Sequence, residues 1–374
     1  MRIIRRLAIG LAMFFGLATA AAANDSSSEL SVGGLVLVKN DSIAMQREDL
    51  TLSPSEVRVR YEMRNDTDKP VTLLVAFPMP EVPKDTPAGM RSGSAHNLDM
   101  KPPTDVNFIG FRLWVNGQQG TPEAEIRATL ANGHDVTEEL RQMGGLPLVL
   151  QPRIFLLPTD PVERAGPNGG WDLDAATRRK LQDLGALRQE AYGYETLWTT
   201  RITFHWMQTF PPGVTVVEHS YRPILGGQLF AAERRGKIGV VDADHGVWTG
   251  SMDEDLARAY CIDGPTDRAM RTVYKRMLHA RLAAGSQDGA YFVANVLGYL
   301  LRTAQNWRGP IGTFHLVLLG GRVSALGAKG GETQVMSLCT DLPLRRTAPM
   351  RFEATMHDYV PRQDLRVLIV GDDQ

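Results

Sequence analysis

The sequence lacks any long apolar run beyond its first residues, and it lacks an excess of charge of either sign. A membrane-spanning helix needs about 20 consecutive apolar residues, and no stretch downstream of the N-terminus supplies them. The chain carries 41 Lys and Arg residues against 42 Asp and Glu residues, without a basic tract. Nucleic acid is therefore not an expected partner, and stable insertion of the mature chain into a membrane is not expected either.

Motifs of common exported enzymes are also missing. There is no His-Glu-x-x-His zinc motif, no Cys-x-x-Cys pair and no Gly-x-Ser-x-Gly nucleophile elbow. Glycines surround Lys329 between positions 320 and 331, but their spacing does not match a phosphate-binding loop, which favours a flexible hairpin. No catalytic residue, metal ligand or cofactor is therefore predicted.

The dispersed histidines, acidic clusters and tryptophans of the chain each have a simple structural interpretation. Four histidines on predicted strands could converge on zinc, although the missing local spacing favours four unrelated sheet residues: His205, His219, His315 and His357. Acidic clusters at 242–245 (Asp242, Asp244 and His245) and 253–255 are typical of a turn and of the first turn of a helix. Five tryptophans could line a sugar platform, but core packing is favoured because two share one strand face: Trp114, Trp198, Trp206, Trp248 and Trp307.

The N-terminus has the three parts of a cleavable signal peptide. Arginines precede the apolar run from Leu7 to Leu17, and small residues end at Ala23. We expect cleavage between Ala23 and Asn24, so that residues 1–23 are removed. The sequence therefore predicts export to the periplasm or the medium.

Residues 24–130 have the alternation of a β-sheet. Apolar side chains recur at every second position over 57–63, between charged ones, and alternation resumes over 71–77 after a turn cluster at 65–70. These two segments are predicted to pair as a hairpin with one buried face. A third strand over 108–115 ends at Asn116-Gly117, a strong hairpin turn.

Helical patterns dominate residues 131–196. Asp135 and Glu138 resemble a capping box before a short helix, and leucines near helical spacing predict a longer helix over 173–187. The segment is thus predicted to be a helical and loop insertion between two β-rich units.

Residues 197–374 return to strands. Alternation over 198–206 and 214–221 predicts a second hairpin across Pro211-Pro212-Gly213, and a helical excursion spans about 251–284. The predicted fold class is mainly β (α+β): two β-sandwich-like units with a helical insertion between them.

The two cysteines, Cys261 and Cys339, form an even pair in a chain predicted to enter an oxidising compartment. One structural disulfide is the simplest expectation. Two separate buried thiols are the alternative.

Several stretches spread over most of the chain resemble one bacterial exported family. They are 48–50 (Glu-Asp-Leu), 57–61 (Val-Arg-Val-Arg-Tyr), 75–80 (Val-Ala-Phe-Pro-Met-Pro), 208–211 (Gln-Thr-Phe-Pro), 218–221 (Glu-His-Ser-Tyr), 260–261 (Tyr-Cys), 306–311 (Asn-Trp-Arg-Gly-Pro-Ile) and Phe314. The family is the domain of unknown function 4424. The resemblance implies a periplasmic, two-part, β-rich protein and supplies no catalytic residue. The stretch 57–80 is also similar to the β-sandwich of vault and inter-alpha-trypsin proteins.

Export, β patterning and a single disulfide favour a non-catalytic binding or structural module of the cell envelope. Its partner would be an envelope protein or a polysaccharide. The alternative is an exported hydrolase that acts on an envelope polymer through a dispersed active site, which sequence spacing does not reveal.

Overall fold

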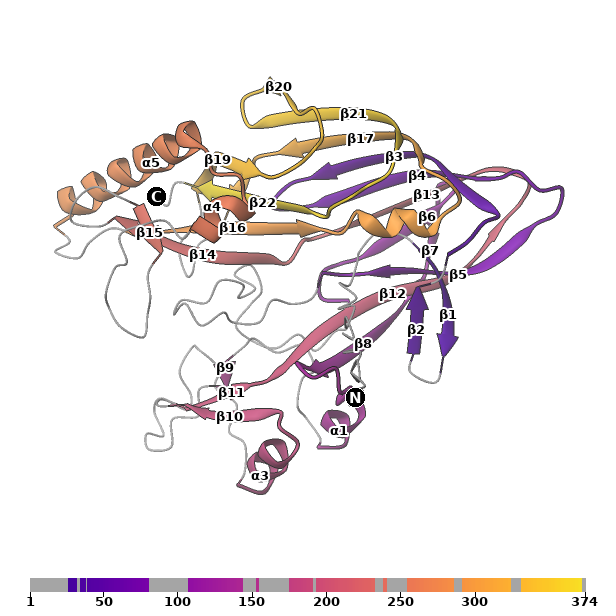
Figure 1. Ribbon diagram of the computed structural model, residues 1–374, viewed down its shortest axis with the longest axis horizontal. Coiled ribbons are helices and arrows are strands. Elements are labelled where there is room, and N and C mark those ends of the chain that lie inside the picture. Colours follow the sequence, from indigo (N-terminus) through magenta and orange to yellow (C-terminus); the bar gives the residue numbers. More distant parts are fainter. Residues whose placement is uncertain are drawn as a thin grey trace, which may run out of the picture.

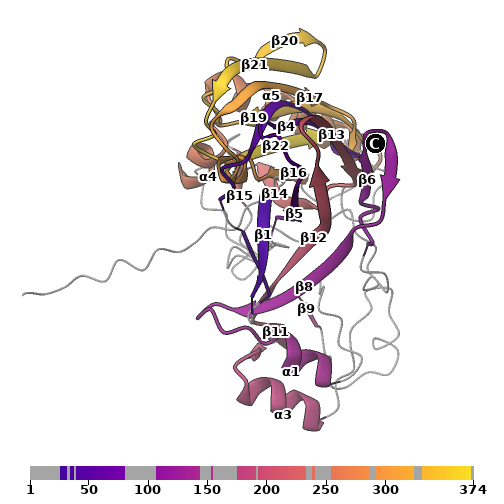
Figure 2. The same cartoon turned by 90° about the vertical axis from the view of Figure 1, so that its right-hand side faces the viewer.

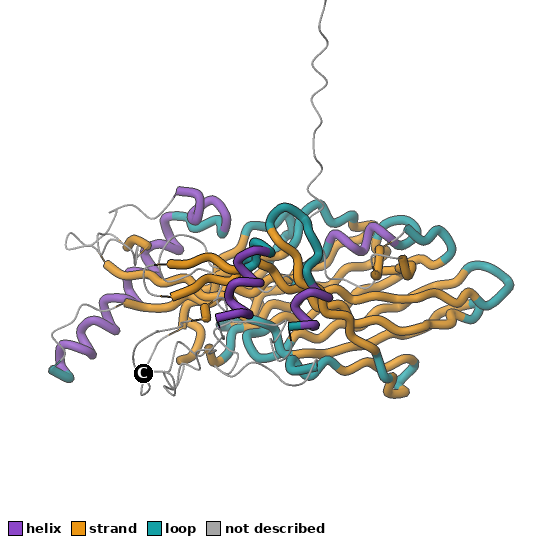
Figure 3. The backbone as a smooth tube through the Cα atoms, turned by 90° about the horizontal axis from the view of Figure 1, so that it is seen from below, coloured by secondary structure: helices purple, strands orange, loops and turns teal. Residues whose placement is uncertain are grey.

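The computed structural model describes residues 26–31, 34–37, 39–80, 107–143, 153–154, 175–190, 193–232, 238–240, 254–285, 291–323 and 331–371. Strands make up most of the described residues (Figure 1), so the mainly β class is confirmed. Many strands run side by side along the long axis of the molecule (Figure 3). None of the helices in these ranges is long and apolar enough to cross a membrane.

The largest sheet of the described residues has eight strands, and we call it the central sheet. Its order is β20 (Arg345–Ala348), β21 (Arg351–Tyr359), β17 (Ile311–Leu319), β3 (Ile43–Leu52), β4 (Val57–Asn65), β13 (Gly213–Tyr221), β6 (Arg112–Val115) and β7 (Gln118–Gly120). Strand β17 runs parallel to β3, and the other neighbours are antiparallel. Segments from both ends of the chain therefore lie next to one another.

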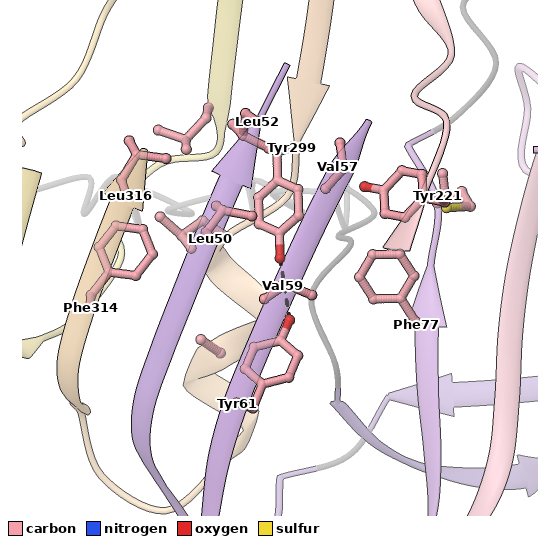
Figure 4. Packing of buried hydrophobic residues seen from close by; sticks show 14 of the residues in the cluster. Leu50, Leu52, Val57, Val59, Tyr61, Phe77, Tyr221, Tyr299, Phe314 and Leu316 are labelled. Carbon is pink, nitrogen blue, oxygen red and sulfur yellow. Dashed lines mark hydrogen bonds between the residues drawn. The ribbon is translucent and has the colours of Figure 1, made fainter. Parts of the chain in front are cut away.

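Two further sheets cover the inner face of this central sheet. One has the order β2 (Gly34–Leu37), β1 (Ser26–Ser31), β5 (Val71–Pro78), β12 (Trp198–Phe210) and β8 (Glu123–Leu130). The other has the order β15 (Ile238–Val240), β14 (Leu225–Ala232), β16 (Tyr291–Tyr299), β22 (Leu365–Gly371), β19 (Gly331–Leu338) and β18 (Arg322–Val323). One continuous hydrophobic cluster contains buried residues of all three sheets (Figure 4), and its burial holds the layers together.

Helices lie at two ends of the molecule. Helices α1 (Thr137–Gln142) and α3 (Ala175–Asp183) lie beside the small sheet of β9 (Arg153–Ile154), β10 (Leu187–Glu190) and β11 (Gly193–Thr196), away from the central sheet (Figure 2). Helices α4 (Glu254–Ala259) and α5 (Gly264–Ala283) lie on the six-stranded sheet, and the 3-10 helix η1 (Arg302–Asn306) links β16 to β17. The described residues of the segment 131–196 thus contain two helices and three short strands.

The strand faces follow the sequence pattern. Val57, Val59, Tyr61 and Met63 of β4 are all buried, whereas the intervening side chains are exposed or half-buried. The same alternation holds along β12, where the even-numbered side chains from Trp198 to Phe210 are buried. Asn116 and Gly117 both adopt positive φ and connect β6 to β7, as a two-residue hairpin turn requires.

Both long hairpins predicted from the sequence are wrong. Strand β4 pairs with β3 and β13, and β5 pairs with β1 and β12, so the turn at 66–70 leads from one sheet to another. The turn at 211–212 does the same, since β12 and β13 belong to different sheets. Alternation shows which face of a strand is buried, but it does not show which strand lies beside it.

The helix predicted over 173–187 is shorter. Helix α3 ends at Asp183, Gly185 adopts a positive φ of 72°, and Leu187 begins strand β10. A glycine in this conformation ends a helix, because an L side chain would be strained there.

The central sheet combines strands of the predicted first and last segments. Strands β3 and β4 lie beside β13 and β17, which come from residues beyond 197. The domain boundaries at 130 and 196 stay predictions. Strand pairing nevertheless joins the first segment (24–130) and the last segment (197–374) in one sheet.

Candidate functional site

A line of side chains crosses the outer face of the central sheet. Strand pairing places one residue from each of seven neighbouring strands in register: Thr355, His315, Asp49, Arg60, Glu218, Trp114 and Gln119. They share one face because successive side chains alternate, and their chain neighbours on β17, β3, β4 and β13 are buried. At about 4.8 Å per strand this polar row is roughly 29 Å long.

Asp49 is the centre of the ion pairs in the polar row. Its carboxylate lies 2.7 Å from Arg47, 3.8 Å from Arg60 and 3.5 Å from Nδ1 of His315. Arg60 also contacts Glu62 at 2.7 Å. Hydrogen bonding to Asp49 raises the pKa of Arg47, so this part of the face carries fixed charges of both signs.

One end of the polar row borders a second carboxylate, Glu353. Its side chain lies 3.9 Å from Nε2 of His315 and accepts hydrogen bonds from Arg351 and Thr347. The bond from Arg351, followed by that from Thr347, lowers the pKa of Glu353. The imidazole of His315 therefore lies between two carboxylates and is charged only when protonated.

Near its other end, next to Gln119, the polar row carries an aromatic ring. Trp114 is half-buried, and the guanidinium of Arg112 lies 5.5 Å from the centre of its ring, within cation–π distance. Arg112 also reaches Glu56 at 3.6 Å. A flat apolar ring thus continues the line of charges at the surface.

A carboxylate lies directly beneath this face. Glu48 is fully buried, and the Tyr299 hydroxyl donates a hydrogen bond to it at 3.4 Å. The hydroxyls of Tyr299 and Tyr61 lie 3.3 Å apart (Figure 4). These contacts join β3 and β4 of the central sheet to β16 of the six-stranded sheet, so the buried groups fix how the two sheets pack.

Strand irregularity explains why Glu48 faces inward. The register between β3 and β4 shifts between Met45 and Arg47, which makes Gln46 an extra residue. Odd-numbered side chains are buried before this bulge, and even-numbered ones from Glu48 onward are buried after it. Sequence reasoning missed the buried carboxylate, although the change of apolar phase between Met45 and Leu50 was a usable signal.

The four candidate zinc ligands are not brought together. His219 is 1% exposed and packs against Phe77, with the two ring centres 4.4 Å apart. His315 and His357 lie on the outer face, and His205 lies on a strand of the five-stranded sheet. Among the described residues no group of three or more His, Cys, Asp or Glu could hold a metal ion.

The tryptophans separate in the same way. Trp198, Trp206 and Trp307 are buried, as core packing predicts, and only Trp114 of the described tryptophans lies in the polar row. Trp248, the cluster at 242–245 and the signal cleavage site at 23–24 lie outside the described residues. The same holds for Asp253 and for residues 324–330 of the glycine-rich segment, which is flanked by the paired strands β18 and β19.

A disulfide joins Cys261 to Cys339, with their Cα atoms 5.0 Å apart. It connects the segment between α4 and α5 to the end of β19. The Ser337 hydroxyl donates a hydrogen bond to the carbonyl oxygen of Tyr260 at 2.8 Å in the same place. The helical excursion is thus tied to its own sheet.

Comparison with solved structures gives a distant likeness. A crystal structure from Legionella pneumophila, described as that of a "putative nutrient binding protein", is 12% identical with a TM-score of 0.38, covering 93% of this chain and 70% of the other. No curated protein matches this chain. A family model matches residues 23–368, almost the whole sequence. The chain therefore belongs to the family defined by the domain of unknown function DUF4424.

Proposed function

We propose that the protein is an exported, non-catalytic binding module of the cell envelope, and that the polar row is its binding face. The observation that carries this proposal is the register of seven strands, which presents charges of both signs and one aromatic ring in a line. A line of roughly 29 Å can contact an extended polysaccharide or an envelope protein along its length.

Paired charges favour binding over catalysis on this face. A general acid at neutral pH needs a raised carboxyl pKa, whereas the pKa of Glu353 is lowered by Arg351. Asp49 is held by three basic groups at once. Such ion-paired groups supply a fixed pattern of charge, which a partner with complementary charges can recognise.

Export is supported by two independent features. The N-terminal sequence has the form of a signal peptide, and the single disulfide is typical of an oxidising compartment. N-terminal sequencing of the exported protein should begin at Asn24, and a periplasmic form that begins at Met1 would contradict cleavage.

The binding proposal is tested by capture from envelope extract with matched variants. The purified protein, Arg60→Glu and Trp114→Ala are immobilised in parallel with Arg362→Glu, an exposed arginine outside the polar row. A protein or polysaccharide retained by the wild type and Arg362→Glu, but lost from both row variants of native melting temperature, supports the proposal. Equal capture by all four forms would rule out the polar row as the binding face.

A further inference from the structure

Helix α5 presents two opposite faces of different chemistry. Met270, Val273, Tyr274 and Met277, spaced as one side of a helix, are buried in a cluster with β16, β19 and β22. Arg268, Thr272, Lys275 and His279 are exposed and fall on the opposite side at 100° per residue. We call these four residues the outer stripe, which is roughly 16 Å long at 1.5 Å per residue.

The charged residues of this helix are mostly basic. Its 20 residues include five Arg or Lys residues and a single acidic residue, Asp267. Asp267 is already paired with Arg271 at 2.7 Å, and Arg276 donates a hydrogen bond to Gln334 at the sheet. Lys275 has no ion-pair partner among the described residues, in a chain whose net charge is close to zero. The basic character of α5 is therefore a local feature of the surface.

The end of the outer stripe is apolar. Leu282 follows His279 on the same side and is 53% exposed, whereas the helix's other described large apolar side chains are buried against the sheet. Helix α5 lies at one end of the molecule, at its edge (Figure 1). Basic side chains with an exposed leucine in one line match a surface of anionic headgroups above acyl chains.

From this geometry we propose that the outer stripe of α5 attaches the protein peripherally to a bilayer rich in anionic phospholipid. The basic side chains contact the phosphate groups, and Leu282 enters the interface. The helix does not insert further, because its apolar side is already packed on the six-stranded sheet. This contact is separate from the polar row on the central sheet.

Vesicle co-sedimentation of the full protein tests the proposal. We expect binding to vesicles of phosphatidylglycerol and phosphatidylcholine in equal parts, little binding to pure phosphatidylcholine, and release by high salt. The double variant Arg268→Glu/Lys275→Glu should bind the anionic vesicles at least about tenfold more weakly, because it reverses two exposed charges. Leu282→Asp should also weaken binding.

The matched control is Arg179→Glu/Lys180→Glu, which makes the same change of net charge on exposed residues of α3. This control should bind like the wild type, and all variants should keep the native melting temperature. Equal loss in both double variants, or no binding by the wild type, would overturn the proposal. Binding to heparin, a soluble polyanion, without binding to anionic vesicles would replace the lipid with a polyanionic polymer and also overturn it.

Discussion

The side-chain amide of Asn65 donates hydrogen bonds to the carbonyl oxygens of Phe210 and Lys69, at 2.9 and 2.8 Å. Asn65 ends β4 and Phe210 ends β12, and after each of these two strands the chain passes to the other strand's sheet. The side-chain carbonyl oxygen of Asn65 also accepts hydrogen bonds from the main-chain N–H and from the hydroxyl of Thr67. One buried amide thus ties together the ends of β4 and β12, from which two of the connections between these sheets begin.

Asn65→Ala should lower the free energy of unfolding by about 2–4 kcal/mol, because it leaves the Phe210 carbonyl oxygen buried without this donor. Thr67→Ala is the matched control, since it removes only a hydroxyl at the exposed edge of the same turn, and it should cost less than about 1 kcal/mol. Chemical denaturation of both variants measures the difference. Equal losses would show that Asn65 does not hold the two connections.

The buried face of β4 gives a second prediction. Val59→Asp should lower the free energy of unfolding by several kcal/mol, about the cost of an unpaired charge in an apolar core. Arg58→Asp, one position away on the exposed face, should change it by roughly 0.5 kcal/mol or less. Thermal melts of the two variants decide, and a larger loss for Arg58→Asp would reverse the assignment of faces.

The bulge in β3 requires a glycine opposite it. A Cβ atom added at Gly312 would lie 2.6 Å from the main-chain oxygen of Gln46, a contact that only a backbone shift can relieve. Gly312→Ala should therefore cost about 1–3 kcal/mol. Gly298→Ala in β16 is the control, because its Cβ would meet no heavy atom within 4 Å. Similar melting temperatures for the two variants would contradict the bulge geometry.

Local patterns predicted local structure well in this chain. The buried faces of β4 and β12 and the long helix α5 depend on side-chain periodicity within one segment, which the sequence displays directly. The pairing of β4 with β13 and of β5 with β12 could not be predicted in this way, because each of these partners lies more than 100 positions away in the sequence.

The candidate site could not be predicted from the sequence, for the same reason. Asp49, Glu218 and His315 meet in one row only because β3, β13 and β17 enter one sheet, and no spacing along the chain records this. Glu48 is buried because a single extra residue changes the phase of β3. The family resemblance includes some of these stretches, but it does not show that they lie side by side in one sheet.

The last prediction concerns the disulfide between Cys261 and Cys339, which lie 78 residues apart in sequence. Closing so long a loop reduces the entropy of the unfolded chain, which corresponds to about 4 kcal/mol of stability. That is a large part of a typical net stability of roughly 5–15 kcal/mol. The bridge fastens the helical excursion, including the basic helix α5, to β19.

The double variant Cys261→Ser/Cys339→Ser should therefore melt well below the wild type, and reduction of the wild type should lower its melting temperature in the same way. Ser337→Ala is the control, because it removes one hydroxyl at the same junction, which donates to the carbonyl oxygens of Tyr260 and Cys261, and it should cost about 1 kcal/mol. The bond itself is checked by intact mass after alkylation of the denatured wild-type protein without reductant. Two added alkyl groups would mean free thiols and would contradict the bridge, whereas an unchanged mass with a drop in melting temperature on reduction would establish it as the covalent tie between α5 and its sheet.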